Sequence, residues 1–290
     1  LFPLMFLCRF SIISFMLNIS AYQTKTYYLY FDTEDEGIQT YKQEVTYKYV
    51  PSIGGYNFSG YSYFGAQTHD YKGGKAWEVF HRWGDAGATD GFGSGTAPYY
   101  DGAWNWNPDI RWNYFYTTTN RYHEDGEILE EGPLFITYTT NKMEFRRGST
   151  LLDWATAVTT YRFFKWGLSA ETNITFTEDH DITGSYYWRM CEWVYEYNTF
   201  RYVIIEDATY YYPSSSATWT GPYQYYGFMN ELNGKATGCI WLETKQKGIS
   251  LSLDERRIFR RTSYYDFWDR RLQGHVTTNS WIWERYVVVI

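Results

Sequence analysis

The sequence predicts an all-β protein, built as a β-jelly roll or a two-sheet antiparallel sandwich. Three observations indicate this class. Helical periodicity is almost absent, short runs of β-branched and aromatic residues alternate with polar ones, and clusters of Gly, Pro, Asn and Ser separate the runs. Regular short strands between such turns are typical of sandwiches and barrels.

The clearest alternating runs cover residues 135–139, 202–205 and 286–290. Turn signals separate the runs along the chain, because Gly, Pro and Asn supply the backbone conformations that turns need. They occur at residues 54–55, 73–74, 107–108, 131–133, 213–216 and 233–234, and residues 84–95 form the clearest long loop. The strongest helical pattern, at residues 150–160, is moderate and marks the one place where the sequence allows a short helix.

The chain divides into three predicted parts. Residues 1–20 are apolar with a single Arg9 and precede a polar segment, which resembles a secretory signal peptide that lacks its first residues. We therefore expect a secreted, extracellular protein. A soft boundary near residue 110 separates a β-rich N-terminal region of unassigned role, residues 21–110, from a jelly-roll domain, residues 111–290.

Charge and cysteine content limit the possible partners. Acidic residues number 33 against 26 basic ones, a net charge of −7, so nucleic acid is a poor partner. Outside residues 1–20 no stretch approaches 18 apolar residues, so no helical membrane span is expected. No Cys/His cluster is present, and we expect no metal or cofactor. Cys191 and Cys239 permit one disulfide, although nothing in the sequence shows that they meet.

The chain contains 32 Tyr, 19 Phe and 14 Trp. A buried Tyr hydroxyl or Trp N–H needs a hydrogen-bond partner, so many of these rings should lie half-exposed, with the polar tip in water. Flat aromatic surfaces of this kind suit sugars, which have apolar faces and hydroxyl rims. The candidate sugar-binding residues are Trp193, Tyr202, Tyr211 and Trp219, with Trp104, Trp106 and Tyr223 as further candidates.

From about residue 135 onward, ordered motifs resemble the family 11 glycoside hydrolases, the β-jelly-roll xylanases. The motifs are residues 135–141 (FITYTTN), 151–154 (LLDW), 202–207 (YVIIED), 266–270 (DFWDR) and 274–281 (GHVTTNSW). The resemblance implies a jelly roll that hydrolyses β-1,4-xylan.

A retaining mechanism needs a nucleophilic carboxylate and a carboxyl acid/base about 5–5.5 Å apart. At the nucleophile position of the family this chain has Phe200 or Arg201, neither of which can attack a sugar. Glu206 and Glu196 are the nearby acids that could substitute. Glu284, in the last strand, corresponds to the acid/base. We therefore expect xylan hydrolysis that is very weak or absent.

The sequence thus indicates a secreted jelly-roll protein that binds β-linked polysaccharide, in the form of a divergent or inactive endo-β-1,4-xylanase. Two alternatives stay open. One is a non-enzymatic, aromatic-rich β-sandwich that binds glycans or protein partners. The other is an outer-membrane β-barrel, which also combines an export signal with many alternating strands.

Overall fold

The computed structural model describes residues 43–50, 55–60, 64–68, 76–81, 104–111, 115–118, 126–140, 142–147, 150–165, 167–195, 202–206, 208–211, 217–230, 235–249, 256–260, 264–268 and 270–289. All regular elements in these residues are strands, and every pairing between them is antiparallel. The predicted all-β class is therefore confirmed. Within the described part of the chain, no helix is long and apolar enough to cross a membrane. The predicted signal segment, residues 1–20, lies outside the described residues.

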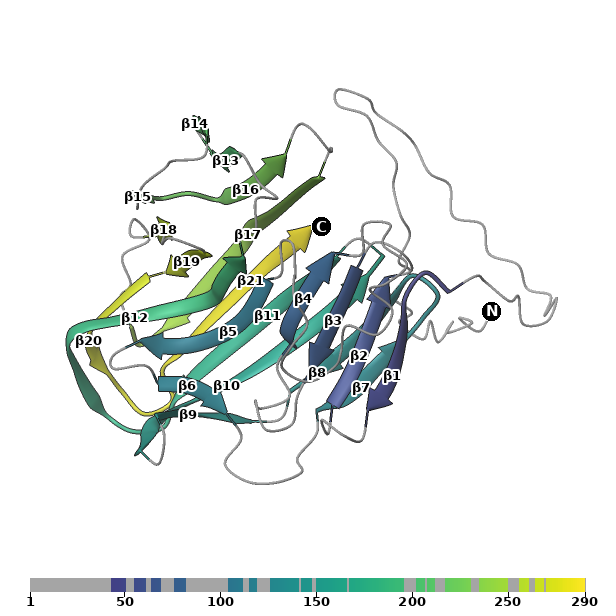
Figure 1. Ribbon diagram of the computed structural model, residues 1–290. Helices are drawn as coiled ribbons and strands as arrows, with labels where there is room; N and C mark the ends of the chain where they lie inside the picture. Colours follow the sequence, from purple (N-terminus) through teal and green to yellow (C-terminus); the bar gives the residue numbers. More distant parts are fainter. Residues whose placement is uncertain are drawn as a thin grey trace, which may run out of the picture.

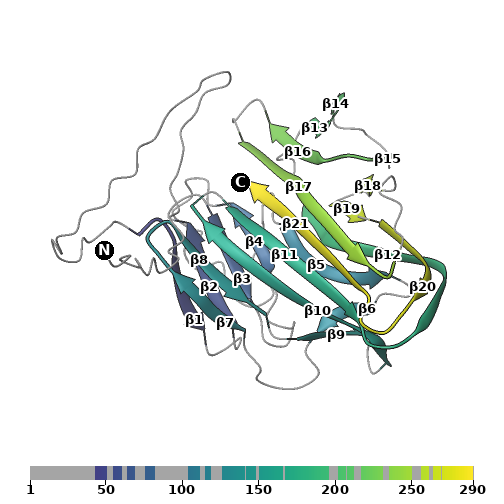
Figure 2. The ribbon, with the colours of Figure 1, turned by 180° about the vertical axis from the view of Figure 1, so that it is seen from behind.

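The strands form two layers, which Figures 1 and 2 show from opposite sides. The first sheet has the strand order β7-β8-β10-β11-β21-β17-β16-β13-β14. Its strands are β7 (Glu127–Glu131), β8 (Phe135–Thr139), β10 (Thr150–Phe164), β11 (Gly167–Phe176), β21 (Trp281–Val289), β17 (Lys235–Lys247), β16 (Tyr225–Asn230), β13 (Tyr202–Ile205) and β14 (Ala208–Tyr211).

The second sheet runs from β1 through β5 to β12, and β19 and β20 pair with the other side of β12. Beyond β19 follow β18 and β15. These strands are β1 (Thr46–Val50), β2 (Gly55–Gly60), β3 (Phe64–Thr68), β4 (Ala76–His81), β5 (Trp104–Arg111), β12 (His180–Tyr195), β19 (Tyr264–Trp268), β20 (Arg270–Val276), β18 (Arg256–Arg260) and β15 (Ala217–Gly221).

Two short strands join the layers. β6 (Phe115–Thr118) pairs with β5, and β9 (Met143–Arg147) pairs with both β6 and β10, so the hydrogen-bonded ladder is continuous. Because β5 also pairs along β12, strands from both sides of the predicted boundary at residue 110 share one sheet.

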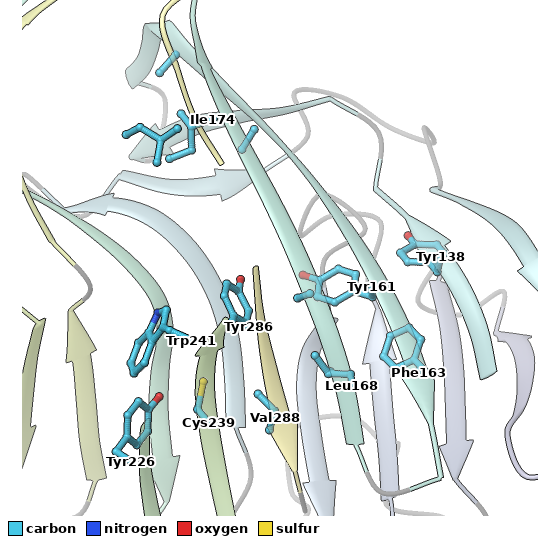
Figure 3. Close-up of a cluster of buried hydrophobic side chains, with 14 of the residues drawn as sticks. Tyr138, Tyr161, Phe163, Leu168, Ile174, Tyr226, Cys239, Trp241, Tyr286 and Val288 are labelled. Carbon is cyan, nitrogen blue, oxygen red and sulfur yellow. The ribbon is translucent and has the colours of Figure 1, made fainter. Parts of the chain in front are cut away.

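The interior between the layers is aromatic. Phe58 of β2 stacks on Phe163 of β10 with ring centroids 3.9 Å apart, and it also contacts the ring of Tyr138. Figure 3 shows Tyr161, Phe163, Leu168, Tyr286 and Val288 among the buried side chains of the first sheet. A buried aromatic ring removes a large apolar area from water, so these contacts hold the layers together.

The helix allowed at residues 150–160 was a wrong prediction, because this segment is part of β10. Ala155, Ala157, Tyr161 and Phe163 are buried, whereas Val158 is exposed, so the segment alternates with the two-residue period of a strand. Leu and Ala, which favour helices, gave the false signal.

The turn predicted at Asn107 and Pro108 was also wrong, because both residues lie inside β5. The β5–β12 register shifts at this point: Asp109 is opposite Arg189, and Trp106 is opposite Cys191. Proline has no N–H to donate to a ladder, so within a sheet it is tolerated at such a bulge. The signal marked an irregularity of the strand rather than its end.

Candidate functional site

Alternation along β21 gives its side chains two environments. Ile282, Glu284, Tyr286 and Val288 are buried on the inner face of the first sheet, which contacts the second layer. Trp281, Trp283, Arg285 and Val287 are half-buried on the outer face. Both faces of the strand therefore carry large side chains, and each face offers a candidate site.

On the inner face a row of polar side chains crosses the sheet at Glu284. Across the strands Thr159 is opposite Thr172, Thr172 is opposite Glu284, and Glu284 is opposite Thr244. The Thr244 hydroxyl donates to Glu284 Oε1 at 3.3 Å. Thr172 Oγ1 lies 3.0 Å from Thr159 Oγ1 and 3.1 Å from the Tyr286 hydroxyl. We call Thr159, Thr172, Glu284 and Thr244 the inner polar row.

Glu284 is 1% exposed, so a polysaccharide cannot reach its carboxylate in this conformation. A buried carboxylate is costly unless hydrogen bonds satisfy it, and the Thr244 hydroxyl supplies one of these bonds to Glu284. The row therefore stabilises a polar group inside the sheet.

The structure does not bring Glu284 together with Glu206. Glu206 follows β13 and is exposed, and its Oε2 accepts a hydrogen bond from the backbone N–H of Gln224 at 2.8 Å. From β13 to β21 the sheet crosses β16 and β17, which are three strand spacings or about 14 Å. That separation is far beyond the roughly 5–5.5 Å of a retaining pair. Glu196 lies outside the described residues.

The predicted sugar-binding residues are spread over both sheets. Trp193 lies in β12, and Trp219 in β15 is half-buried against the core. Tyr202 and Tyr211 are directly opposite each other on β13 and β14. The structure thus brings this tyrosine pair together but leaves it in a different sheet from both tryptophans. Their role in binding stays a prediction.

On the outer face two tryptophans lie side by side on β21. Trp281 and Trp283 are two residues apart, so their Cα atoms are separated by about 6.8 Å along the strand. Trp281 is flanked by Thr175 on β11 and Lys247 on β17, and Trp283 by Asn173 and Lys245. We call Trp281, Trp283, Asn173, Thr175 and Lys247 the tryptophan platform.

A network of ion pairs holds the surroundings of Trp283 in place. Lys245 Nζ lies 5.0 Å from the centroid of the Trp283 ring and 2.8 Å from Glu243. The guanidinium of Arg285 lies 5.7 Å from the same ring centroid and also approaches Glu243 and Glu171. Cations near an indole ring are attracted to its electron-rich face, so both contacts favour this placement of the Trp283 ring.

The same contacts hold the pKa of Glu243 below its ordinary value. The hydrogen bond from Lys245 lowers this pKa most, burial opposes it, and the charges of Lys245 and Arg285 lower it further. Glu243 therefore remains ionised and paired. A carboxylate in this state is a poor proton donor.

Sequence reasoning missed this platform. In the sequence, Trp281 was noted only as the last residue of the motif at 274–281, and Trp283 was not predicted to bind sugar. The usable signal was the segment 281–286, WIWERY, in which strand alternation places both tryptophans on one face and Ile282 and Tyr286 on the other. Sequence alone could not show which of these two faces is exposed to water.

The sequence matches no protein-family model and has no significant match among curated proteins. Similar solved structures include a galactose mutarotase-like protein from Lactobacillus casei, with a TM-score of 0.44 and 8% identity over 80% of this chain and 98% of that chain. A candidate aldose 1-epimerase from Escherichia coli K12 gives a TM-score of 0.43 and 7% identity, over 79% of this chain and 96% of the other.

The resemblance to family 11 xylanases was therefore wrong. The similar structures are mutarotase-like and epimerase-like β proteins, and no family model supports the motif matches. The error has a compositional cause: a chain that is 22% aromatic, with many Thr-containing strands, produces short motifs of Tyr, Trp and Thr by chance. At this low identity and TM-score the likeness gives no information about activity.

Proposed function

We propose that this protein binds polysaccharides through the tryptophan platform. The observation that carries the proposal is the placement of Trp281 and Trp283 side by side on the outer face of the first sheet. A pyranose ring has a face of C–H groups that stacks on a flat indole, and its hydroxyls project from the rim.

The polar neighbours of the tryptophans suit the sugar rim. Asn173 is exposed and Thr175 is half-exposed, and both lie next to the indoles on β11. The amide and hydroxyl groups of these side chains can both donate and accept hydrogen bonds, as sugar hydroxyls also can. Apolar surface with a few convergent polar groups is the usual composition of a ligand site.

The rigidity of the platform supports the same function. Regular strands on both sides fix the backbone, and the pairing with β11 and β17 is continuous through Trp281 and Trp283. A preformed surface loses little conformational entropy when a ligand binds. Secretion, which would give access to extracellular polysaccharides, stays a prediction.

Binding by Trp281→Ala and Trp283→Ala variants tests this function. The probes are soluble neutral β-linked glucans and xylan, and the measurement is the Kd from isothermal titration calorimetry. Each variant should weaken binding roughly two- to tenfold, because an aromatic stacking contact contributes about 0.5–1.5 kcal/mol. The double variant should weaken binding further.

Two control variants sharpen this experiment. Tyr49→Ala removes an exposed aromatic ring on β1, far along the chain, and should leave binding unchanged. Glu284→Gln alters the inner face and should also leave the Kd unchanged. If the Trp281/Trp283 double variant binds every glycan as tightly as the parent, the proposed function is wrong.

A further inference from the structure

Lys247 differs from the other cations near the tryptophan platform. It lies on β17 directly opposite Trp281, and it is exposed. Lys245, two residues earlier, is paired with Glu243 at 2.8 Å, and Arg285 approaches Glu243 and Glu171. Among the residues that the structure describes, no carboxylate forms an ion pair with Lys247. In the described part of the chain, the platform therefore carries a lysine without an ion-pair partner, directly opposite one of its stacking rings.

The protein as a whole is acidic, with a net charge of −7. An acidic protein repels acidic polymers at long range, but salt screens this repulsion beyond about 8–10 Å. At contact distance the local charge decides the interaction. Here Lys247 is directly opposite Trp281, whose indole a sugar ring can cover.

We propose that the preferred ligand is an acidic polysaccharide whose sugars carry carboxylates, that is, a uronic-acid-bearing β-linked glycan. A uronic acid has its carboxylate on the edge of the pyranose ring. When such a ring stacks on Trp281, the carboxylate lies at the rim of the indole, where Lys247 can form an ion pair with it. This inference rests on the proposed function, since it assigns the ligand class of the same platform.

The geometry separates two contributions to binding. Trp281 supplies stacking, which is indifferent to the charge of the sugar. Lys247 supplies a charge contact, which requires a carboxylate and weakens with salt. An exposed ion pair contributes about 0.2–1 kcal/mol, so Lys247 should favour the acidic form roughly 1.5- to fivefold.

The test uses two polymers that differ in one group. The probes are a glucuronic-acid-substituted xylan and the same xylan after chemical reduction of its carboxyl groups, each titrated calorimetrically into the full chain. The parent should bind the acidic polymer more tightly, and the preference should shrink at high salt. Lys247→Gln should remove the preference, because it should weaken binding to the acidic polymer more than binding to the reduced polymer. The matched control Lys48→Gln, an exposed lysine on β1, should retain it.

Equal affinity of the parent for the two polymers would overturn the inference, as would a preference that survives in Lys247→Gln. Both results leave the proposed function intact if Trp281→Ala still weakens binding to the reduced polymer. Loss of that Trp281 dependence would overturn both proposals. Binding to anionic phospholipid vesicles, with no binding to either xylan, would identify a membrane surface as the ligand and also overturn both.

Discussion

Two neighbouring rows of side chains cross the first sheet one residue apart and face opposite ways. The inner polar row, Thr159, Thr172, Glu284 and Thr244, lies on the inner face, and hydrogen bonds from hydroxyl groups join Thr159 to Thr172 and Thr244 to Glu284. The adjacent outer row consists of Thr160, Glu171, Arg285 and Glu243, in which ion pairs join the last three residues.

The difference shows how polar groups on the same strands are stabilised in the protein interior and at the surface exposed to water. Inside, a charge costs several kcal/mol unless hydrogen bonds satisfy it, and the Glu284 carboxylate accepts one from the Thr244 hydroxyl. Outside, water already solvates the charges, so ion pairs add little stability but can orient side chains. We infer that the inner face supplies the stability of the sheet and that the outer face is free to carry a function.

The largest effect should come from the inner aromatic core. Phe163→Ala removes the ring that stacks on Phe58 between the layers. We expect a loss of about 3–5 kcal/mol in the free energy of unfolding, because the deletion creates a cavity as well as losing apolar burial. Urea denaturation followed by far-UV circular dichroism measures the loss. Val158→Ala, on the outer face of the same strand, should cost no more than about 0.5 kcal/mol. Similar losses for both variants would contradict the division of roles between the faces.

An intermediate effect should come from the inner polar row. Thr172→Val keeps the shape of the side chain but removes the hydroxyl between those of Thr159 and Tyr286. The two buried partners each lose a hydrogen bond, so we expect a loss of about 1–3 kcal/mol in the free energy of unfolding. Thr156→Val, the same change on the outer face of β10, is the control and should be nearly neutral. If Thr172→Val is as stable as the parent, the hydroxyl chain contributes no stability.

The smallest effect should come from the outer row, and it should depend on pH. The pKa of Glu243 is lowered in the folded protein, first by the hydrogen bond from Lys245 and then by the charges of Lys245 and Arg285. A carboxyl with a depressed folded-state pKa contributes stability above its unfolded pKa, and this stability is lost as pH falls through the folded value.

Glu243→Gln should therefore reduce stability slightly at neutral pH and make the loss of stability below about pH 4.5 less steep. Thermal unfolding of the parent and the variant between pH 3 and pH 7 measures the two slopes. The difference at neutral pH should disappear in high salt, because exposed charges are screened. A difference that persists in high salt would mean that the outer row contributes stability as a buried network does.

The strands themselves could be predicted from sequence where alternation was strong. Residues 135–139 and 202–205 were expected as strands, and they are β8 and β13. Short-range patterns sufficed there, because a strand surface needs only a two-residue period and β-branched or aromatic residues. Prediction failed at residues 150–160, where Ala and Leu favoured a helix locally, but pairing with β8, β9 and β11 imposed a strand.

For the candidate site, the sequence predicted the type of residue involved but not its position. The abundance of Tyr and Trp indicated half-exposed aromatic rings, and these are present at Trp281 and Trp283. Their position could not be derived from the sequence, because cross-strand partners such as Thr175 and Lys247 lie about 106 and 34 residues away along the chain. For the same reason the sequence suggested Glu284 and Glu206 as a catalytic pair, although three strand spacings separate their strands.

By itself, the sequence determined that the chain forms strands and which side chains of each strand share a face. A two-residue period is a local property. It places Ile282, Glu284 and Tyr286 on one face of the strand and Trp281, Trp283 and Arg285 on the other face. The tertiary structure decided which of these faces the second layer covers. That choice depends on contacts between residues far apart in the chain, such as Phe58 with Phe163, and on the burial of whole sheets rather than of single residues. It left Glu284 inside and the two tryptophans outside.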